Sequence, residues 1–495
     1  MRALSIIRAA GAETCHPWPR HILRTPDWAA MVQALPEDPD LALVALWADT
    51  LQVHALFHVV GAGRIVLASV PVEAGAYPAV SPARQGAAWF ERAIHDLWGH
   101  RAEGGADLRP WLDHGTWAQA APLSARPAAA EHASEPPTFL PPVAEGLASL
   151  PVGPVTGTLD DAFHLRLGLR GETIAQAEMR LGYLHRGIPA LLRGKAPRTA
   201  ARFVARLAAD ATVAHALAFA EAAEAAMAVT VPPRAVALRR MMLECERIAV
   251  HLDDLAAIAA AVGASSVARA CETPREWLLR GLEQAFGHRL MMDCVVPGGI
   301  AAAVGPAELQ ALRRGIGAVS AALPDLRRRL AAGACLPRLA GLGRVSSGLA
   351  AALALGGIAG RASGRRWDAR MLDGFLEYAP ALERAGDAAA RTRLRIAEIV
   401  ASLEILARSL DFVPEGEVSV ALPMVSGEGV ACVESARGDV WHWLRLDHGQ
   451  IAAAFPRDPG WALWPALEAA LSGAAAEEML PIARSFGLVA AGVDL

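Results

Sequence analysis

The sequence predicts an α+β N-terminal domain followed by a larger, mostly α-helical domain that contains a small β-sheet. Two observations lead to this fold class. Short apolar runs separated by turn residues fill the first part of the chain, which is typical of a β-meander. Alanine-rich segments of helical length dominate the rest, and alanine is the strongest helix former. We expect the domains to span residues 1–120 and 151–495, with a flexible linker at 121–150.

The N-terminal domain is expected to contain strands and one amphipathic helix. The strands are predicted at residues 41–47, 51–59 and 64–70. Asp49–Thr50 and Gly61–Gly63 separate these apolar runs, as turn residues do between strands. A helix is predicted at 84–99, where apolar residues recur at helical spacing. Its apolar face consists of Phe90, Ile94, Leu97 and Trp98.

The second domain is expected to begin with a short strand at 164–169 and to continue with long helices. These helices are predicted at 200–227, 235–262, 273–289, 306–331, 388–410 and 461–472. The first is either one helix or two that are separated near Asp210. The third begins at a capping box, Thr273-Pro-Arg-Glu276, because Thr273 can cap the first turn and proline is tolerated there. The segment 415–449 has the pattern of a β-hairpin, with strands at 429–434 and 440–446.

The composition excludes several classes of function. The formal net charge is −4, from 47 basic and 51 acidic side chains, so we expect no nucleic-acid partner. No apolar run reaches the roughly 20 residues that span a bilayer, and the N-terminus lacks the apolar region of a signal peptide. We therefore expect a cytoplasmic protein that meets a membrane only through partners. The six cysteines show no CxxC spacing, so neither a cysteine-bound metal nor a disulfide is expected.

Two segments of the N-terminal domain carry a known signature. The first is Phe90-Glu-Arg-Ala-Ile-His-Asp-Leu-Trp-Gly99, and the second is Ala106-Asp-Leu-Arg-Pro-Trp-Leu112. They resemble the E-R-x-x-x-D-x-x-G helix end and the P-D-L-R-R turn of the small hydrophilic subunit of respiratory complex I. Ala106 and Pro110 depart from that turn, so the match is partial.

A second set of motifs follows in the rest of the chain. It begins with Gly171-Glu-Thr-Ile174 and Leu181-Gly-Tyr-Leu-His-Arg-Gly-Ile188. The later motifs are, in order, Val231–Arg234, Glu246–Ile248, His251–Leu252, Gly287–Arg289 and Val296–Gly299. The set resembles the signature shared by the quinone-site subunit of complex I and the large subunit of membrane-bound nickel–iron hydrogenases. The whole chain thus looks like a fusion of both parts, as in energy-converting hydrogenases of the formate hydrogenlyase type.

The positions that hold the metal in the hydrogenases are altered. Members of that branch bind nickel and iron through two CxxC pairs, whose soft thiolates converge on the ions. The matching positions here are Ala208 and Ala211 in the first pair, and Val489 and Gly492 in the second. These side chains cannot ligate a metal, so we expect neither a nickel–iron centre nor an active nickel–iron hydrogenase.

The quinone clamp of the complex I branch is also incomplete. In that branch a histidine and a tyrosine bind the quinone, and an aspartate partners the histidine. Here Phe219 stands where the tyrosine is expected, and Ala261 stands where the aspartate is expected. His164 instead agrees with the hydrogenase branch, and Asp161 stands where that branch has a proton-relaying acid.

The resemblance implies a subunit of a membrane-associated oxidoreductase complex, either NADH:quinone oxidoreductase-like or hydrogenase-derived. Its partners would be an iron–sulfur small subunit and antiporter-like membrane subunits, on the cytoplasmic side of the inner membrane. In one alternative, the partner's cluster reduces a quinone in the former metal cleft, and this chain binds no other cofactor. The candidate proton donors are then Asp161, His164, Tyr183, His185 and His215. In the other alternative, the chain is a non-catalytic subunit that couples its neighbours, and these side chains only support the fold.

Overall fold

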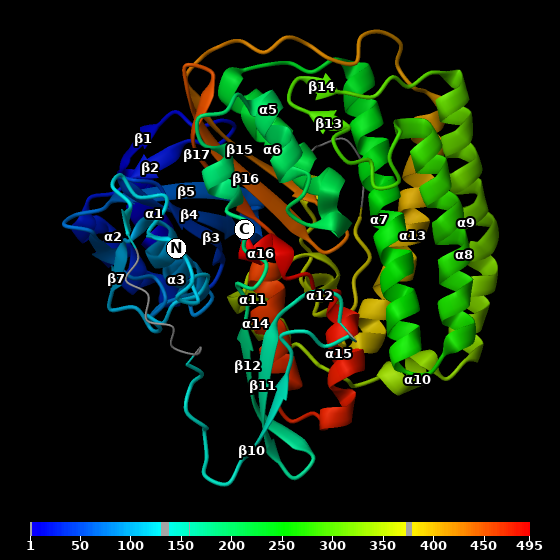
Figure 1. Cartoon of the computed structure of the whole chain (residues 1–495), viewed down its shortest axis with the longest axis horizontal. Coiled ribbons are helices and arrows are strands. Elements are labelled where there is room, and N and C mark those ends of the chain that lie inside the picture. The colour runs from blue at the N-terminus through cyan, green and yellow to red at the C-terminus, as the bar shows by residue number, and fades with distance from the viewer. Residues whose placement is uncertain (1, 130–137, 158, 373–378) are drawn as a thin grey trace.

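The computed structural model describes residues 2–129, 138–157, 159–372 and 379–495. It confirms the predicted fold class, with an α+β N-terminal part and a mainly helical remainder that carries small sheets. Figure 1 shows the N-terminal sheet on one side, a layer of long helices on the other, and the sheet β15–β17 between them. The long helices are α7 (Pro233–Ala261), α8 (Ser265–Phe286), α9 (Pro306–Ala332) and α13 (Ala388–Asp411). Residues 130–137 of the predicted linker lie outside the described residues.

The N-terminal part is built on a five-stranded sheet with the strand order β1-β2-β5-β4-β3. The three predicted strands are confirmed as β3 (Leu41–Ala48), β4 (Gln52–Val59) and β5 (Arg64–Pro71). The predicted helix is α3 (Ala87–Trp98), and all four residues of its apolar face are buried. The elements that were not predicted are α1 (Arg2–Ala9), β1 (Gly11–Glu13), β2 (Arg20–Ile22), α2 (Thr25–Ala34), β6 (Ala76–Pro78) and β7 (Arg101–Glu103).

The helices of the second part follow the predicted order, with one correction. Residues 200–227 are divided into α5 (Pro197–Val204) and α6 (Thr212–Met227), and the separation includes Asp210. The predicted helix start at Thr273 is wrong, because α8 already begins at Ser265 and contains Pro274 in its interior. Val267, Ala268 and Cys271 continue the buried face of α8 before the proline. Their packing outweighs the backbone hydrogen bond that the proline cannot make.

Small sheets and short helices complete the second part. The predicted hairpin is confirmed as β15 (Gly427–Glu434) and β16 (Asp439–Asp447), and an unpredicted strand, β17 (Gln450–Arg457), extends it. The predicted strand at 164–169 is β11 (His164–Arg170), which pairs with β10 (Ala148–Val152) and β12 (Thr173–Arg180). The shorter helices include α4 (Ile188–Leu192), α10 (Cys335–Leu339), α11 (Ser347–Ala352), α12 (Gly357–Ala362), α14 (Gly460–Leu471), α15 (Met479–Phe486) and α16 (Ala491–Asp494).

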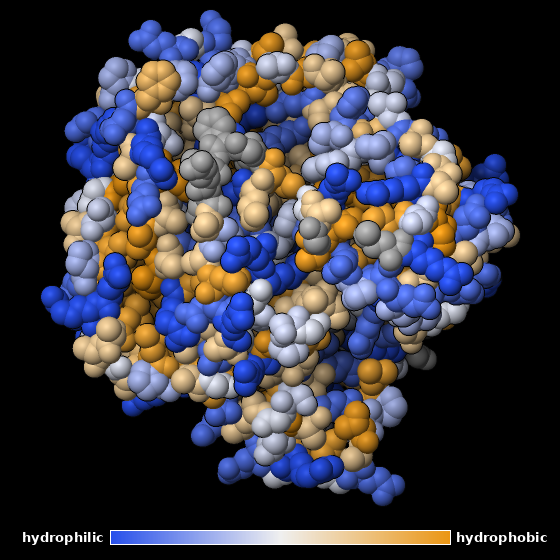
Figure 2. Space-filling model, turned by 180° about the vertical axis from the view of Figure 1, so that it is seen from behind, coloured by the Kyte–Doolittle hydropathy of each residue, from blue (hydrophilic) through white to orange (hydrophobic). Residues whose placement is uncertain are grey.

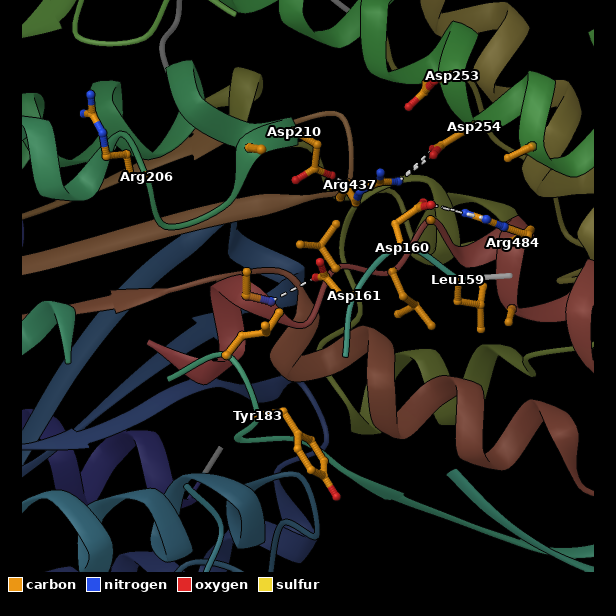
Figure 3. A pocket seen from close by; sticks show the side chains of 18 of the residues that line it. Leu159, Asp160, Asp161, Tyr183, Arg206, Asp210, Asp253, Asp254, Arg437 and Arg484 are labelled. Carbon is orange, nitrogen blue, oxygen red and sulfur yellow. Dashed lines mark hydrogen bonds and ion pairs between the residues drawn. The ribbon is translucent and has the colours of Figure 1, made fainter. Parts of the chain in front are cut away.

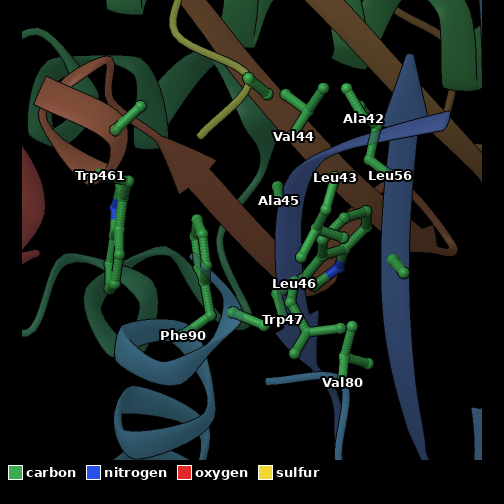
Figure 4. Packing of buried hydrophobic residues seen from close by; sticks show 14 of the residues in the cluster. Ala42, Leu43, Val44, Ala45, Leu46, Trp47, Leu56, Val80, Phe90 and Trp461 are labelled. Atoms are coloured by element: carbon green, nitrogen blue, oxygen red, sulfur yellow. The ribbon is translucent and has the colours of Figure 1, made fainter. Parts of the chain in front are cut away.

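The N-terminal part and the C-terminal elements share one hydrophobic core. Trp47 of β3 contacts Trp443 of β16, with ring centroids 5.7 Å apart. Phe90 of α3 stacks on Trp461 of α14 at 4.3 Å, and Figure 4 shows this pair beside β3. Aromatic pairs of this kind bury large apolar areas. The two parts are therefore held together by hydrophobic packing as well as by the connecting segment of the chain.

The sheet β10–β12 projects from the body of the molecule. In Figure 2, which shows the molecule from behind, it forms the narrow projection at the bottom. Leu150 and Val155 are exposed in this region, with 40% and 85% of their surface accessible. In the described part of the chain, no helix combines the length and the apolar character that crossing a membrane requires.

Candidate functional site

A cavity of about 820 Å³ lies where α7, the loops next to β11 and β12, and the C-terminal segment meet. Figure 3 shows its charged side chains, which come from segments far apart in the sequence. Its wall is formed by residues 159–161, 183–186, 206, 209–210, 253–254, 257, 292, 437, 483–484, 487–489 and 491. Cavities of this size are typical of sites for small molecules.

The cavity brings together three of the five predicted proton donors. Asp161, Tyr183 and His185 line it. His164 does not, because it lies on β11, where its ring contacts Phe139 edge-on at 4.8 Å. His215 is fully buried within α6 and also lies outside the cavity wall.

The four positions matched to the hydrogenase cysteines border the same cavity. Val489 lines it, and Gly492 directly follows a lining residue. Ala208 and Ala211 are buried on either side of two lining residues. No cysteine lines the cavity, and all six cysteines of the chain are buried. Within the described residues, no group of three His, Cys, Asp or Glu side chains is arranged to hold a metal ion.

The C-terminal segment fixes Asp161 in the cavity wall. Its Oδ2 accepts hydrogen bonds from the backbone N–H groups of Ala490 at 2.6 Å and Ala491 at 3.1 Å. In Figure 3 the Asp161 carboxylate is directed toward this segment, whereas the Tyr183 hydroxyl is directed away from it. Asp161 therefore has a clear structural role, whereas the Tyr183 hydroxyl is directed away from the acidic residues of the wall.

The same segment holds His185 in a defined tautomer. The Nδ1 atom of His185 lies 2.6 Å from the carbonyl oxygen of Asp494, and the ring stacks on Trp117 at 4.6 Å. A carbonyl oxygen only accepts hydrogen bonds, so Nδ1 carries the proton and Nε2 is left as an acceptor. Burial lowers the pKa of His185 and raises the pKa of Tyr183, so both side chains are neutral near pH 7.

A charged cluster that was not predicted forms another side of the wall. The guanidinium of Arg437, in the turn between β15 and β16, donates to Asp254 of α7 at 2.8 Å and also to Asp210. Burial alone would lower the pKa of Arg437, but the carboxylates of Asp254 and Asp210 raise it above its ordinary value. Arg437 is therefore a fixed positive charge at the cavity. The adjacent acids of Asp253-Asp254, directly after His251-Leu252, are the only local signal that pointed to this cluster.

His215 belongs to a buried polar chain behind the cavity. Its Nε2 lies 3.0 Å from Oδ2 of Asp458, and its Nδ1 lies 3.0 Å from Nε2 of His442. A Cβ atom built at Gly492 would lie only 2.5 Å from Cγ of Asp458. The aspartate therefore occupies the space that a side chain at position 492 would need.

Asp494 makes the stability of the folded protein depend on pH. It is fully buried, and burial raises the pKa of its carboxyl to about 7 although the N–H groups of Leu184 and Gly182 bind it. The folded protein then keeps this proton up to about pH 7, whereas the unfolded chain releases it near pH 4. Because the folded state binds more protons in this window, its stability falls as the pH rises through it.

Replacing Asp494 with asparagine is expected to remove that part of the pH dependence. Between about pH 4 and pH 7 the free energy of unfolding of Asp494→Asn should change less than that of the unaltered protein, by on the order of 3 kcal/mol. Urea unfolding at several pH values measures this difference. Asp160→Asn is the matched control, because 83% of the Asp160 side chain is exposed. An Asp494→Asn protein with the same pH dependence as the unaltered chain would contradict the raised pKa.

Comparison with known families confirms the two resemblances. A family model described as respiratory-chain NADH dehydrogenase, 30 Kd subunit, matches residues 21–131. A model described as nickel-dependent hydrogenase matches residues 186–258, and one described as respiratory-chain NADH dehydrogenase, 49 Kd subunit, matches residues 261–426. The matches follow one another along the chain, so the fused arrangement is confirmed as well.

Individual proteins similar to this chain come from the same two groups, the hydrogenases and the NADH-quinone oxidoreductases. Formate hydrogenlyase subunit 5 of Escherichia coli (strain K12) is 28% identical over 427 residues, which cover 80% of this chain and 73% of that protein. An NADH-quinone oxidoreductase subunit of Carboxydothermus hydrogenoformans is 29% identical over 308 residues, covering 61% of this chain and 82% of its own length. A chain in the structure of the membrane-bound sulfane sulfur reductase, an archaeal respiratory membrane complex, has a TM-score of 0.66 at 24% identity. The match covers 72% of this chain and 100% of that chain, and the two chains share a fold.

Proposed function

Because this chain is a fused relative of the complex I 30 kDa and 49 kDa subunits and of nickel-dependent hydrogenases, we propose that it is a subunit of a membrane-associated respiratory oxidoreductase complex. In this proposal, electrons pass from an iron–sulfur cluster in a partner small subunit to a quinone-like acceptor in the cavity. Antiporter-like membrane subunits complete the complex, which lies on the cytoplasmic side of the inner membrane. The observation that carries the proposal is the cavity itself, which borders the positions matched to the hydrogenase ligands and has proton-exchanging side chains in its wall.

The cavity is suited to proton-coupled reduction rather than to metal chemistry. A quinone takes up two electrons and two protons to become a quinol, so its site needs groups that can supply protons. Tyr183 is a neutral donor, and His185 presents an acceptor nitrogen. The residues at the former ligand positions carry no thiol, so a nickel–iron centre has no ligands here.

The alternative is a non-catalytic coupling subunit. It is favoured by the ion pairs that the charged residues of the cavity wall form with one another. Arg437 is held between two aspartates, and Arg484 forms an ion pair with Asp160 at 2.6 Å. Asp161 is bound by two backbone N–H groups. Such contacts stabilise the fold whether or not an acceptor enters the cavity.

The test begins with the tagged chain purified from gently solubilised membranes, with co-purifying proteins identified by mass spectrometry. The proposal expects an iron–sulfur small subunit and antiporter-like membrane proteins in the sample. It also expects the complex to reduce decylubiquinone with dithionite-reduced methyl viologen as the electron donor. Recovery of the chain alone from the soluble fraction would overturn the assignment to a membrane complex.

Tyr183→Phe separates the two alternatives. If Tyr183 donates a proton to the acceptor, its loss should lower kcat for decylubiquinone about 100-fold. Tyr77→Phe is the matched control, because it removes a hydroxyl that is buried in the N-terminal part. Equal rates in both variants, with the complex intact, would favour the coupling subunit.

A further inference from the structure

Helices α7 and α13 face each other with charged residues instead of apolar ones. On α7, Glu244, Arg247, His251 and Asp254 recur at spacings of three and four residues, which places them on one face. On α13, Arg395, Glu398 and Ser402 recur in the same way. All seven side chains are buried. We call this set the polar seam, and its residues are Glu244, Arg247, His251, Asp254, Arg395, Glu398 and Ser402.

One end of the polar seam opens at the cavity. Asp254 lines the cavity wall and accepts hydrogen bonds from Arg437 at 2.8 Å and from Arg395 at 2.9 Å. Burial alone would raise the pKa of Asp254, but the guanidinium groups of Arg437 and Arg395 lower it. An ionised carboxylate at the cavity wall can accept a proton from the seam and then release that proton into the cavity.

The middle of the seam is a histidine–glutamate pair. Nε2 of His251 lies 3.1 Å from Oε2 of Glu398, and both side chains are inaccessible to solvent. Burial lowers the pKa of His251, and the hydrogen bond to Glu398 opposes that shift. The charged groups around the imidazole are Glu398 and Arg395 on α13, and Arg247 and Asp254 on α7.

The other end of the seam approaches the surface. Ser402 donates to Glu244 at 2.5 Å, and a guanidinium nitrogen of Arg370 lies 3.7 Å from the same carboxylate. The next residue, Met371, is exposed. The seam therefore extends through the helical layer from the cavity to Arg370, the residue that precedes the exposed Met371.

The seam contains buried polar atoms that the described protein groups leave unsatisfied. Nδ1 of His251 and Nε of Arg361 have no hydrogen-bond partner among the described residues. Arg361 is a neighbour of the seam, because it donates to Glu398. Buried polar atoms of this kind are generally met by internal water, since leaving them unpaired is costly. Asp254 follows His251 by three residues on the same face of α7, so the two side chains are neighbours along the seam.

We propose that the polar seam conducts protons from the surface near Met371 to the cavity, with Glu398, His251 and Asp254 as the carriers. The inference rests on the proposed function, because the protons are consumed by the acceptor that is reduced in the cavity. Two electrons from the partner's reduced iron–sulfur cluster and two protons from solvent convert one quinone into one quinol. Each carrier gains a proton on one side and loses it on the other, so it returns to its starting state.

The test uses the purified complex, with decylubiquinone as the acceptor and dithionite-reduced methyl viologen as the donor. His251→Gln keeps a hydrogen-bond donor toward Glu398 but cannot carry a proton. We expect kcat to fall at least tenfold, with KM unchanged, a steeper loss of rate above pH 7, and a larger solvent isotope effect in D2O. Asp254→Asn should show the same changes, and it tests the proposal should His251→Gln fail to assemble.

A matched control separates conduction from simple support of the fold. Glu224 and Arg239 form an ion pair at 2.6 Å that is as buried as the seam but lies outside it. Glu224→Gln should lower stability while leaving the pH profile and the isotope effect unchanged. If the seam variants behave like Glu224→Gln while the unaltered complex reduces decylubiquinone, the seam is structural and the inference is wrong. If the unaltered complex does not reduce decylubiquinone, the proposed function fails, and the conduction proposal fails with it.

Discussion

Replacing Arg361 with methionine is expected to lower the free energy of unfolding by about 3–5 kcal/mol, because it leaves buried carboxylates without their counter-ion. The Arg361 side chain is 1% exposed and contacts three carboxylates, those of Glu398, Glu434 and Asp368. Methionine fills most of the volume, so the loss reflects charge rather than a cavity. Urea unfolding followed by circular dichroism measures the effect.

The same variant has a predictable pH dependence. Arg361 lowers the pKa of all three carboxyl groups, so its removal raises each pKa, and stability then falls as the pH rises through the raised values. The pKa of Glu434 is already raised to about 7 with Arg361 present, because of burial and the neighbouring Asp368. The deficit should therefore be larger at pH 8 than at pH 5. Arg366→Met is the control, since Arg366 is exposed, and a similar small loss in both variants would refute the role given to Arg361.

Placing a cysteine at position 492, which the sequence matches to a hydrogenase ligand, is expected to destabilise the protein by about 1–3 kcal/mol or more, because the added side chain is overpacked. Its Cβ would lie 2.5 Å from both Cγ and Oδ2 of Asp458. Asp458 cannot easily move away, because it also binds His215 at 3.0 Å and the N–H of Gly460 at 2.7 Å. Asp458 therefore leaves no space for a side chain at position 492.

Val489→Cys provides the comparison for that experiment. Val489 is the other position that the sequence predicts for the same pair, and it is only partly buried in the cavity wall. Valine and cysteine are similar in volume, so the change in stability should stay within about 1 kcal/mol. Thermal unfolding of both variants measures the difference. Equal stability of Gly492→Cys and Val489→Cys would contradict the steric argument.

The parts of the fold that could be predicted are those with local signals. Strands β3, β4 and β5 are apolar runs with turn residues between them, and α3 has a complete apolar face. Strand β12 was missed although Ala175–Arg180 alternate apolar and polar residues, which is a strand pattern. The alternation covers only six residues and two of its apolar members are alanine, a helix former, so the signal is short and weak. The start of α8 was misplaced because a local capping pattern at Thr273 competed with tertiary packing, and packing decided the outcome.

The candidate site was predictable only where a family motif passed through it. Motifs placed Asp161, Tyr183 and His185, and the cavity contains all three. Arg437 and Asp254 are 183 residues apart in the chain, so no local pattern joins them. The α7 half of the polar seam is visible in the sequence. Its four charged or polar residues, Glu244, Arg247, His251 and Asp254, recur at helical spacing among apolar residues. Such a stripe can be read from sequence when buried charge is sought deliberately.

The shared core of the two parts has a consequence for biosynthesis. Residues near the N-terminus leave the ribosome first, yet Arg20 finds its buried partner Glu428 only after 408 more residues have been made. Until β15–β17 emerge, the face of the N-terminal sheet that carries Trp47 has nothing to cover it. Domains fold largely in the order of their synthesis, and exposed apolar surface on a nascent chain promotes aggregation. We therefore expect the N-terminal part, when it is synthesised without β15–β17, to aggregate more readily than the full chain.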